Sequence, residues 1–308
     1  MAKMMLADLG FNPEVFRDSV IEGAIQDSQI FDSGIAVQAP AILPPKGNSV
    51  HMPYFTDIGG TSEALSDSTP LTVGKVLGKD MTSVISREGK AIGANDLVKW
   101  NAGADPLVSL EARYRRFWMN VLDLRIAKSF EGAAAVADAE YVLDISAQTG
   151  DAGALNAHNA YEALALRGAG LYDMEFAVMN AKNVTKLSQA DLIDSYRDSE
   201  GRQVRRFVER NIIVSEHLAD DTVIFAERGA IGYADGTPAE VFLEEERSIL
   251  AGDTIFTSRM NFCTHVMGLS WIGSTSASPS EAALATGTNW EVAVSDVRNV
   301  PFVILKTA

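Results

Sequence analysis

The clearest pattern in the sequence is a helical repeat of apolar residues after Asp105-Pro106. Asp105 is a favourable N-cap, and Pro106 suits the first helical position. Apolar residues then follow at intervals of three and four, the spacing of one helix face. These residues are Leu107, Leu110, Tyr114, Phe117, Val121 and Leu124. The pattern predicts a helix from Pro106 to Glu131, stopped by Gly132. It would be a spine about 39 Å long, roughly twice the length of an ordinary helix.

The segment before this helix shows the alternation of extended chain. Val50, Met52, Tyr54 and Thr56 alternate with other residues as in a strand, and after turn-rich residues 57–70 a second extended run covers 71–85. An isolated two-stranded hairpin is marginally stable in water. We therefore expect this excursion to pack on something else, and a neighbouring subunit is the favoured partner.

Both ends of the chain add further elements. Residues 1–31 show a short helical pattern, and the Pro- and Gly-containing residues 32–47 predict an extended arm. After the long helix we predict helices at 157–167 and 182–193, a buried strand at 176–179, and strands throughout the carboxyl part. Those strands cover 212–215, 223–226, 240–244, 254–259, 261–272 and 300–305, with a small-residue helix inside loop 273–288. The mixture predicts an α+β fold.

Composition narrows the range of functions. The 308 residues include 26 Lys+Arg and 41 Asp+Glu, a net charge of −15. Proteins that bind duplex DNA displace counterions with clustered basic residues, so sequence-specific nucleic-acid binding is not expected. The single cysteine, Cys263, allows no internal disulfide, and no stretch has the composition of a membrane span. Asp8 interrupts any secretory hydrophobic region, so we expect a soluble intracellular protein.

The motifs of common catalytic and cofactor sites are missing. Gly74 to Lys79 has the wrong spacing for a phosphate loop, and Gly168-Ala-Gly170 ends a helix instead of opening one. Cys263 and His265 would share one side of a strand but lack the further ligands of a zinc site. Ser215-Glu216-His217 contains triad residue types, but neighbours on a strand alternate in direction. We predict no catalytic, cofactor-binding or metal-binding residue.

Two kinds of charged cluster remain. The acidic runs are Asp198-Ser-Glu-Gly201 and Glu244-Glu-Glu246, and the first lacks the alternating acids of a calcium loop. We interpret them as a turn and as a solvated or intersubunit face. Arg202, Arg205, Arg206 and Arg210 form a basic cluster, for which salt bridges to acids of a neighbouring subunit are favoured over DNA binding.

Several short motifs in the carboxyl half form an ordered series. They are Asp198-Ser-Glu-Gly201, Arg228-Gly-Ala-Ile231, Glu244-Glu-Glu-Arg247, His265-Val-Met-Gly-Leu-Ser-Trp271, Ser278-Pro279, Asn289-Trp290 and the final strand Val300-Pro-Phe-Val-Ile-Leu305. The series resembles the major capsid proteins of tailed bacteriophages. Two positions depart from the pattern, because Asn180 follows Met179 where a histidine is expected and Arg298 stands in place of a lysine.

The resemblance implies the tailed-phage major capsid fold. Its parts would be an N-terminal arm (1–48), an extended hairpin loop (49–94), a peripheral domain with the spine helix (95–139), an axial domain (140–239), and strands that complete the peripheral domain (240–308). It also implies a structural protein without enzymatic activity. Copies would form pentamers and hexamers of an icosahedral shell around phage double-stranded DNA, in the virion, after assembly in the bacterial cytoplasm.

Partners follow from the same resemblance. No long charged N-terminal scaffold region is present, so a separate scaffolding protein and a portal are implied, with a decoration protein as an option. An acidic inner wall would repel packaged DNA. Three alternatives stay open: a cellular nanocompartment shell of the same fold, an intracellular hydrolase using His217 or His265, and, with less support, a tail-tube protein.

Overall fold

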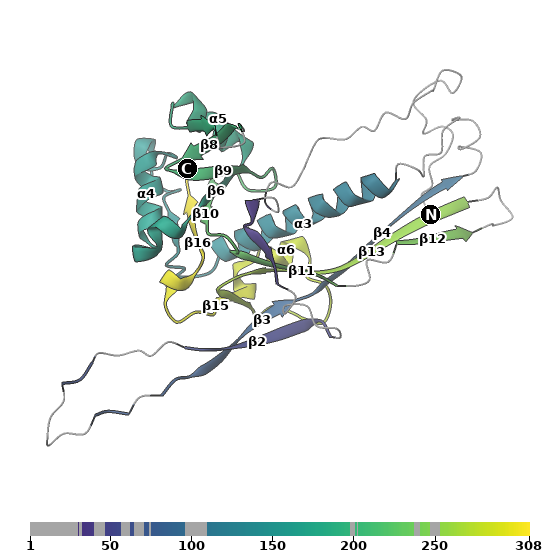
Figure 1. The fold of residues 1–308 in the computed structure, drawn as a ribbon, viewed down its shortest axis with the longest axis horizontal. Helices are drawn as coiled ribbons and strands as arrows, with labels where there is room; N and C mark the ends of the chain where they lie inside the picture. Colours follow the sequence, from purple (N-terminus) through teal and green to yellow (C-terminus); the bar gives the residue numbers. More distant parts are fainter. Residues whose placement is uncertain are drawn as a thin grey trace.

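The computed structural model describes residues 30, 33–39, 47–56, 62–64, 71–73, 75–95, 110–197, 201, 203–236, 241–246 and 253–308. Figure 1 shows two sheets joined by one long helix, with thin projections at opposite ends of the molecule. The predicted N-terminal helix, except for Ile30, and the predicted start of the long helix lie outside the described residues.

The first sheet has seven strands, and helices cover both of its faces. Its order is β5 (Val142–Asp144), β16 (Phe302–Lys306), β10 (Thr222–Ala226), β6 (Phe176–Met179), β9 (Arg210–Val214), β8 (Gln203–Phe207) and β7 (Asp194–Arg197). In β10, Val223 and Phe225 pack with α4 (Ala157–Ala165) and α5 (Ala181–Gln189), whereas Ile224 and Ala226 pack with α3 (Leu110–Ala134). Burial on both faces explains why the central strands are continuous apolar runs.

The last strand lies inside this sheet. β16 pairs antiparallel with β10 and parallel with β5, so Ile304 lies between Ile224 and Val142. The sequence had placed 300–305 as a strand of the peripheral part, and the strand itself is present at Phe302–Lys306. A hydrophobic run reveals a buried strand but not the identity of its neighbours. The domain boundaries given above stay a prediction.

The second sheet is built on one long strand, β13 (Asp253–Val266). β12 (Val241–Glu246) and then β11 (Ile231–Gly236) pair along one edge of it, and β4 (Ser86–Asn95) pairs along the other. β1 (Ala36–Gln38) extends β11 in parallel, as an extended arm segment. The predicted division into 254–259 and 261–272 is wrong, because β13 continues through Met260 and a short turn separates Val266 from β14 (Leu269–Trp271).

The helix predicted at 182–193 is shorter than expected. α5 ends at Gln189, and Asp191 adopts a left-handed φ of 55°. The Leu192 amide then donates to the Leu187 carbonyl at 3.0 Å, a bond typical of a Schellman-type helix end. The chain leaves in an extended direction, so residues predicted as helix up to Ile193 lead into β7.

The long helix is present, but its buried face differs from the predicted stripe. Phe117 is 37% exposed and Val121 and Leu124 are only partly buried, whereas Trp118, Leu122, Ile126, Phe130 and Ala133 are buried. The buried stripe therefore lies one residue later, a rotation of about 100°. Arg125 and Ser129 belong to this buried stripe. Their polarity concealed it from a count of apolar residues.

Gly132 does not stop the helix, which continues to Ala134. Its role is close packing, because a Cβ at Gly132 would lie 2.0 Å from the Leu284 carbonyl oxygen and 2.5 Å from Trp290 Nε1. Leu284 ends α6 (Glu281–Leu284), and Trp290 Nε1 donates to that same carbonyl at 2.8 Å. The helix thus approaches this segment backbone to backbone.

We expect Gly132→Ala to destabilise the protein, although alanine is favoured over glycine inside helices by about 1 kcal/mol. The steric conflict must displace α6 or break the Trp290 bond, and overpacking of this kind costs about 1–3 kcal/mol. Urea unfolding of the unassembled protein measures the difference. Gly78→Ala is the control, because its Cβ would meet only Phe55 Cε1 at 3.9 Å. An increase in stability for Gly132→Ala would contradict the packing role.

Candidate assembly surfaces

A long hairpin extends from one end of the molecule. β2 (Ser49–Phe55) pairs antiparallel with β3 (Gly78–Val84), which confirms the predicted two-stranded excursion. The hairpin and its continuation reach far from the rest of the protein (Figure 1). Large apolar side chains on this projection are exposed to solvent: Phe55 (81%), Leu71 (54%), Val73 (94%), Val76 (49%) and Leu77 (48%). Exposed apolar groups that cluster in this way form a candidate interaction surface.

The base of the hairpin is held on a small two-stranded sheet. This sheet pairs β14 with β15 (Trp290–Val292), and the Trp271 and Trp290 rings meet edge to face at 5.0 Å. The Tyr54 hydroxyl donates to the Ala293 carbonyl, and the Thr82 amide donates to Ser270 Oγ at 3.0 Å. The hairpin is therefore anchored near its base, while its exposed apolar side chains stay free.

The chain passes from the hairpin into the long sheet at residues 85–87. Here Arg87 donates to Asn48 Oδ1 and to the Gly47 carbonyl, both at 2.6 Å, and its amide donates to Ser278 Oγ at 2.8 Å. From the other side, buried Arg125 of α3 donates to Glu88 Oε1 at 2.5 Å, Ser86 Oγ at 2.6 Å and the Pro279 carbonyl at 2.8 Å. The two arginines fix the direction in which the hairpin leaves the body.

The buried pair Cys263 and His265 has no access to a substrate. Cys263 is fully buried, its Sγ donates to the Val84 carbonyl at 3.3 Å, and burial raises the pKa of its thiol to about 12. His265 is 1% exposed, and burial lowers the pKa of its imidazole to about 4 despite a hydrogen bond to the Leu269 backbone. Within the described ranges no three His, Cys, Asp or Glu side chains gather as metal ligands would.

The second histidine considered for hydrolysis has a structural partner. His217 Nε2 lies 2.7 Å from Asn120 Oδ1 on α3, so the ring joins the segment after β9 to the long helix. Ser215 is buried, and its amide donates to the Met179 carbonyl at 3.0 Å. The hydrogen bond given for His217 leads to Asn120 and not to Ser215, so the described residues do not form the nucleophile–base pair of a Ser-His-Asp triad. The arrangement gives no support to a hydrolase.

The charged clusters separate in space. Glu244-Glu-Glu246 lies on β12, at the outer part of the long sheet. Arg205 and Arg206 lie on β8, whereas Arg210 is buried and donates from Nη1 to the Val208 carbonyl at 3.1 Å and from Nη2 to the Leu171 carbonyl at 2.9 Å. Gly74, Asp198 to Glu200 and Arg202 lie outside the described residues. Arg210 therefore has an internal role that the sequence cluster concealed.

Comparison with known proteins finds similarity to a phage capsid protein in sequence and to capsid and phage chains in structure. The chain is 29% identical over 297 residues to the major capsid protein of Bacillus phage SPP1, and the match covers 91% of each protein. The capsid of a native GTA particle superposes with a TM-score of 0.59 at 12% identity, over 95% of this chain and 94% of that chain. A chain from Mycobacterium phage Adephagia superposes with a TM-score of 0.59 at 12% identity, over 99% and 98% of the two chains.

This chain has the tailed-phage capsid fold. The α+β class and the resemblance to tailed-phage major capsid proteins, both predicted from the sequence, are confirmed. No family model matches the chain. In the part of the chain that the structure describes, no helix combines the length and the apolar character needed to cross a lipid bilayer. The exposed hairpin is thus part of a chain with this fold.

We expect the buried imidazole of His265 to make the stability of the subunit depend on pH. Its folded-state pKa of about 4 lies below the ordinary value of 6.5, so the unfolded chain takes up a proton that the folded chain refuses. Stability is therefore full above pH 6.5 and falls by up to about 3 kcal/mol as the pH drops to 4.

Urea midpoints of the unassembled protein between pH 7.5 and 4 measure this effect. His265→Gln should flatten the decline, whereas His158→Gln should keep the wild-type slope because His158 is exposed on α4. An unchanged slope in His265→Gln would show that carboxylates alone cause the acid sensitivity.

Proposed function

We propose that this chain is a major capsid protein, a structural subunit whose copies assemble into the shell of a tailed phage. The observation that carries the proposal is the alignment with the SPP1 major capsid protein over 91% of both chains. The capsid of Ralstonia phage GP4 adds a structural match with a TM-score of 0.59, over 87% of this chain and 94% of that chain. The exposed apolar hairpin supports the same role, since it needs a neighbour to cover it.

The finer features of the shell extend this proposal. Copies form pentamers and hexamers of an icosahedral shell that encloses double-stranded DNA, in the virion, after assembly in the bacterial cytoplasm. A separate scaffolding protein directs assembly, a portal occupies one vertex, and a decoration protein is an optional addition. A net charge of −15 suits an inner wall that repels packaged DNA.

The subunit carries no enzymatic activity in this proposal. The thiol of Cys263 is held in its neutral form by burial, and the His265 ring is enclosed beside Trp290, with ring centroids 6.1 Å apart. Catalysis by general acids and bases requires contact with the substrate. Cys263 and His265 therefore do not offer the accessible base that such catalysis needs.

Sedimentation of the expressed protein, followed by negative-stain microscopy of the fast fraction, tests the shell. We expect capsomer rings, tubes or closed shells, and particles of uniform size when a cognate scaffolding protein is supplied. Uniform shells that form without a scaffold and enclose an enzyme would indicate a nanocompartment instead. A monomer or dimer at all concentrations, even with scaffold, would overturn the shell proposal.

The apolar hairpin should be needed for assembly but not for folding. We expect Phe55→Ser with Val73→Ser to leave the unfolding midpoint nearly unchanged, because both side chains are exposed in the subunit. Particle yield should fall at least about tenfold, since each buried large apolar side chain contributes about 1.5–3 kcal/mol to an interface.

Sucrose-gradient sedimentation with scaffold present measures the yield of this double variant. Lys75→Gln, an exposed polar change in the same loop, is the matched control and should assemble normally. Normal shells from the double variant would show that the apolar hairpin residues are not covered by a neighbour.

A further inference from the structure

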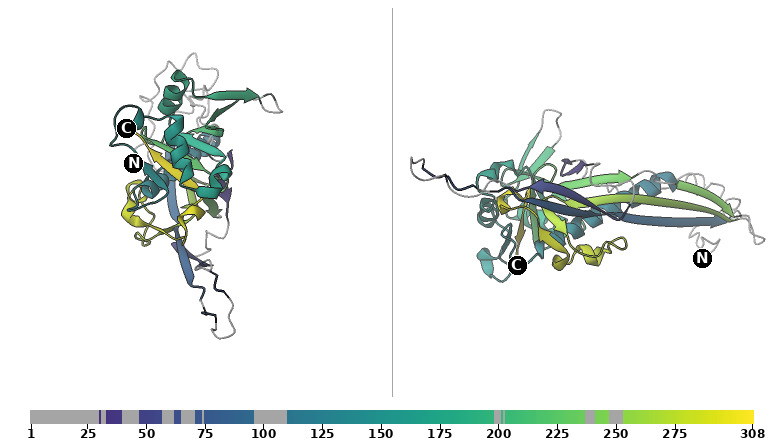
Figure 2. Two further views of the ribbon diagram at one scale, coloured as in Figure 1. Left: turned by 90° about the vertical axis from the view of Figure 1, so that its left-hand side faces the viewer. Right: turned by 90° about the horizontal axis from the view of Figure 1, so that it is seen from below.

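A second, shorter hairpin projects from the seven-stranded sheet. β7 and β8 pair antiparallel, with Asp194 opposite Arg206 and Arg197 opposite Gln203. β7 is the edge strand of the sheet, and all four of its residues are exposed. The left view of Figure 2 shows this hairpin reaching out sideways from the body. Among the described strands, none pairs with the outer edge of β7.

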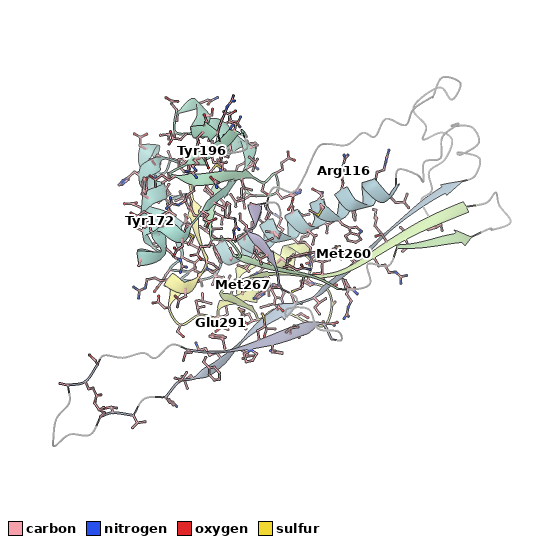
Figure 3. The ribbon with its side chains drawn as sticks, in the orientation of Figure 1. Arg116, Tyr172, Tyr196, Met260, Met267 and Glu291 are labelled. Atoms are coloured by element: carbon pink, nitrogen blue, oxygen red, sulfur yellow. The ribbon has the colours of Figure 1, made fainter. Side chains whose placement is uncertain are left out.

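The described part of this hairpin is basic, in a chain whose net charge is −15. Arg197 and Arg205 are exposed and have no acidic partner in the described part of the chain. Arg206 lies over the Tyr196 ring at 4.2 Å, and its Nε donates to Asn211 Oδ1 at 3.0 Å. Figure 3 shows Tyr196 at this end of the sheet. We call Arg197, Arg205 and Arg206 the arginine arm. Stacking orders one of its guanidinium groups in advance of binding.

The opposite side of the same sheet is acidic. The chain end and the β7–β8 hairpin lie on opposite sides of the module in both views of Figure 2. At the chain end, the Thr307 amide donates to the Asp221 carbonyl at 2.7 Å and the Ala308 amide donates to the Gly153 carbonyl at 2.9 Å. These bonds place the Asp221 segment and the turn with Asp151 side by side, and both aspartates are exposed.

Two further acids border this region, and so do two lysines. Asp144 is exposed and lies opposite Lys306 in the parallel register of β5 and β16, while Asp220 pairs with Lys182. Asp151 and Asp221 have no cationic partner in the part of the chain described. We call Asp144, Asp151 and Asp221 the acidic rim. In its described part, the module thus carries a basic strand pair on one side and a net acidic surface on the other.

We propose that the arginine arm of one copy docks on the acidic rim of the next copy around a capsomer ring. The inference rests on the proposed shell function and names the contact that closes the ring. A ring with cyclic symmetry requires a heterologous interface, in which two different surfaces of one subunit are complementary. Opposite charge on opposite sides of one module meets that requirement and sets the orientation of neighbours.

Double-stranded DNA is the other polyanion that three arginines could contact. Asp194 lies within the same strand pair, and the rest of the chain is acidic, so the sustained Lys/Arg surface of a DNA-binding protein is lacking. A second copy of the chain offers an acidic surface of opposite charge, and is the occupant that the charges favour.

Charge reversal tests the contact in the full chain with scaffold supplied. Arg197→Glu with Arg205→Glu should reduce particle yield at least about tenfold, since like charges at an interface cost several kcal/mol. Asp151→Arg with Asp221→Arg should cause a similar loss. A chain carrying all four changes presents reversed charge on both surfaces and should recover most of the wild-type yield.

Arg113→Glu with Arg116→Glu is the matched control, because both arginines are exposed on α3, where Figure 3 shows Arg116. It changes the net charge by the same amount and should assemble normally. Circular dichroism and the unfolding midpoint establish that each variant is folded before its yield is compared.

The outcomes separate this inference from the shell function. If wild-type protein forms shells and the arm variant does so equally well, the inference fails while the function stands. The inference also fails if both charge-reversed pairs reduce particle yield and the chain carrying all four changes does not recover it. Fluorescence anisotropy with a short DNA duplex tests the alternative partner. If wild-type protein binds the duplex and Arg197→Glu with Arg205→Glu abolishes that binding, the arginine arm contacts DNA and the inference fails. Failure of wild-type protein to assemble rejects the shell function itself.

Discussion

The arrangement of this subunit depends on one buried cation. Arg125 is 3% exposed on the inner face of α3, and its guanidinium joins three segments that are distant in sequence: the helix, the start of β4 and the loop before α6. Burial lowers the pKa of this arginine, and the nearby Glu88 carboxylate opposes that shift. A buried charge is tolerated only where hydrogen bonds and an opposite charge replace water. The partners of Arg125 must therefore keep their positions around its guanidinium, and this constraint fixes where the hairpin leaves the body.

The two sheets differ in how their faces are covered. Helices on both faces of the seven-stranded sheet bury its central strands. The core under α4 and α5 belongs to this module alone, whereas the core on the α3 face is shared with Ile231 and Val266 of the long sheet. The long sheet is covered on one face by α3, where Trp118 Nε1 donates to Ser258 Oγ at 2.8 Å and Leu122 packs on Phe262. Farther out, β12, β13 and β4 continue as a thin ribbon (Figure 1). A thin ribbon gains stability from whatever covers it, so these projections suit a protein that functions as one of many copies.

Periodicity predicted the existence of the main elements but not their surroundings. The helix at 110–134 follows from apolar spacing, yet its buried face includes Arg125 and Ser129, whose polarity moved the predicted stripe to Phe117 and Val121. Gly132 was predicted to end the helix, whereas close approach to Leu284 requires it there. The exposed hairpin could be predicted because two strands alone bury little. The β7–β8 hairpin was missed because its strands are polar and largely exposed, so no apolar alternation marks them.

Net charge and local charge act over different distances in such an assembly. Copies with a net charge of −15 repel one another at long range, but at physiological ionic strength charges more than about 8 Å apart are largely screened. A contact between an arginine and a carboxylate at an interface lies well inside that distance and loses less to salt. In the proposed shell, small basic surfaces would therefore set the orientation of acidic subunits, while burial of the apolar hairpin would add contact energy. On this view the position of the exposed arginines matters more than the net charge, because a short-range contact from Arg197 or Arg205 would offset the repulsion between acidic copies.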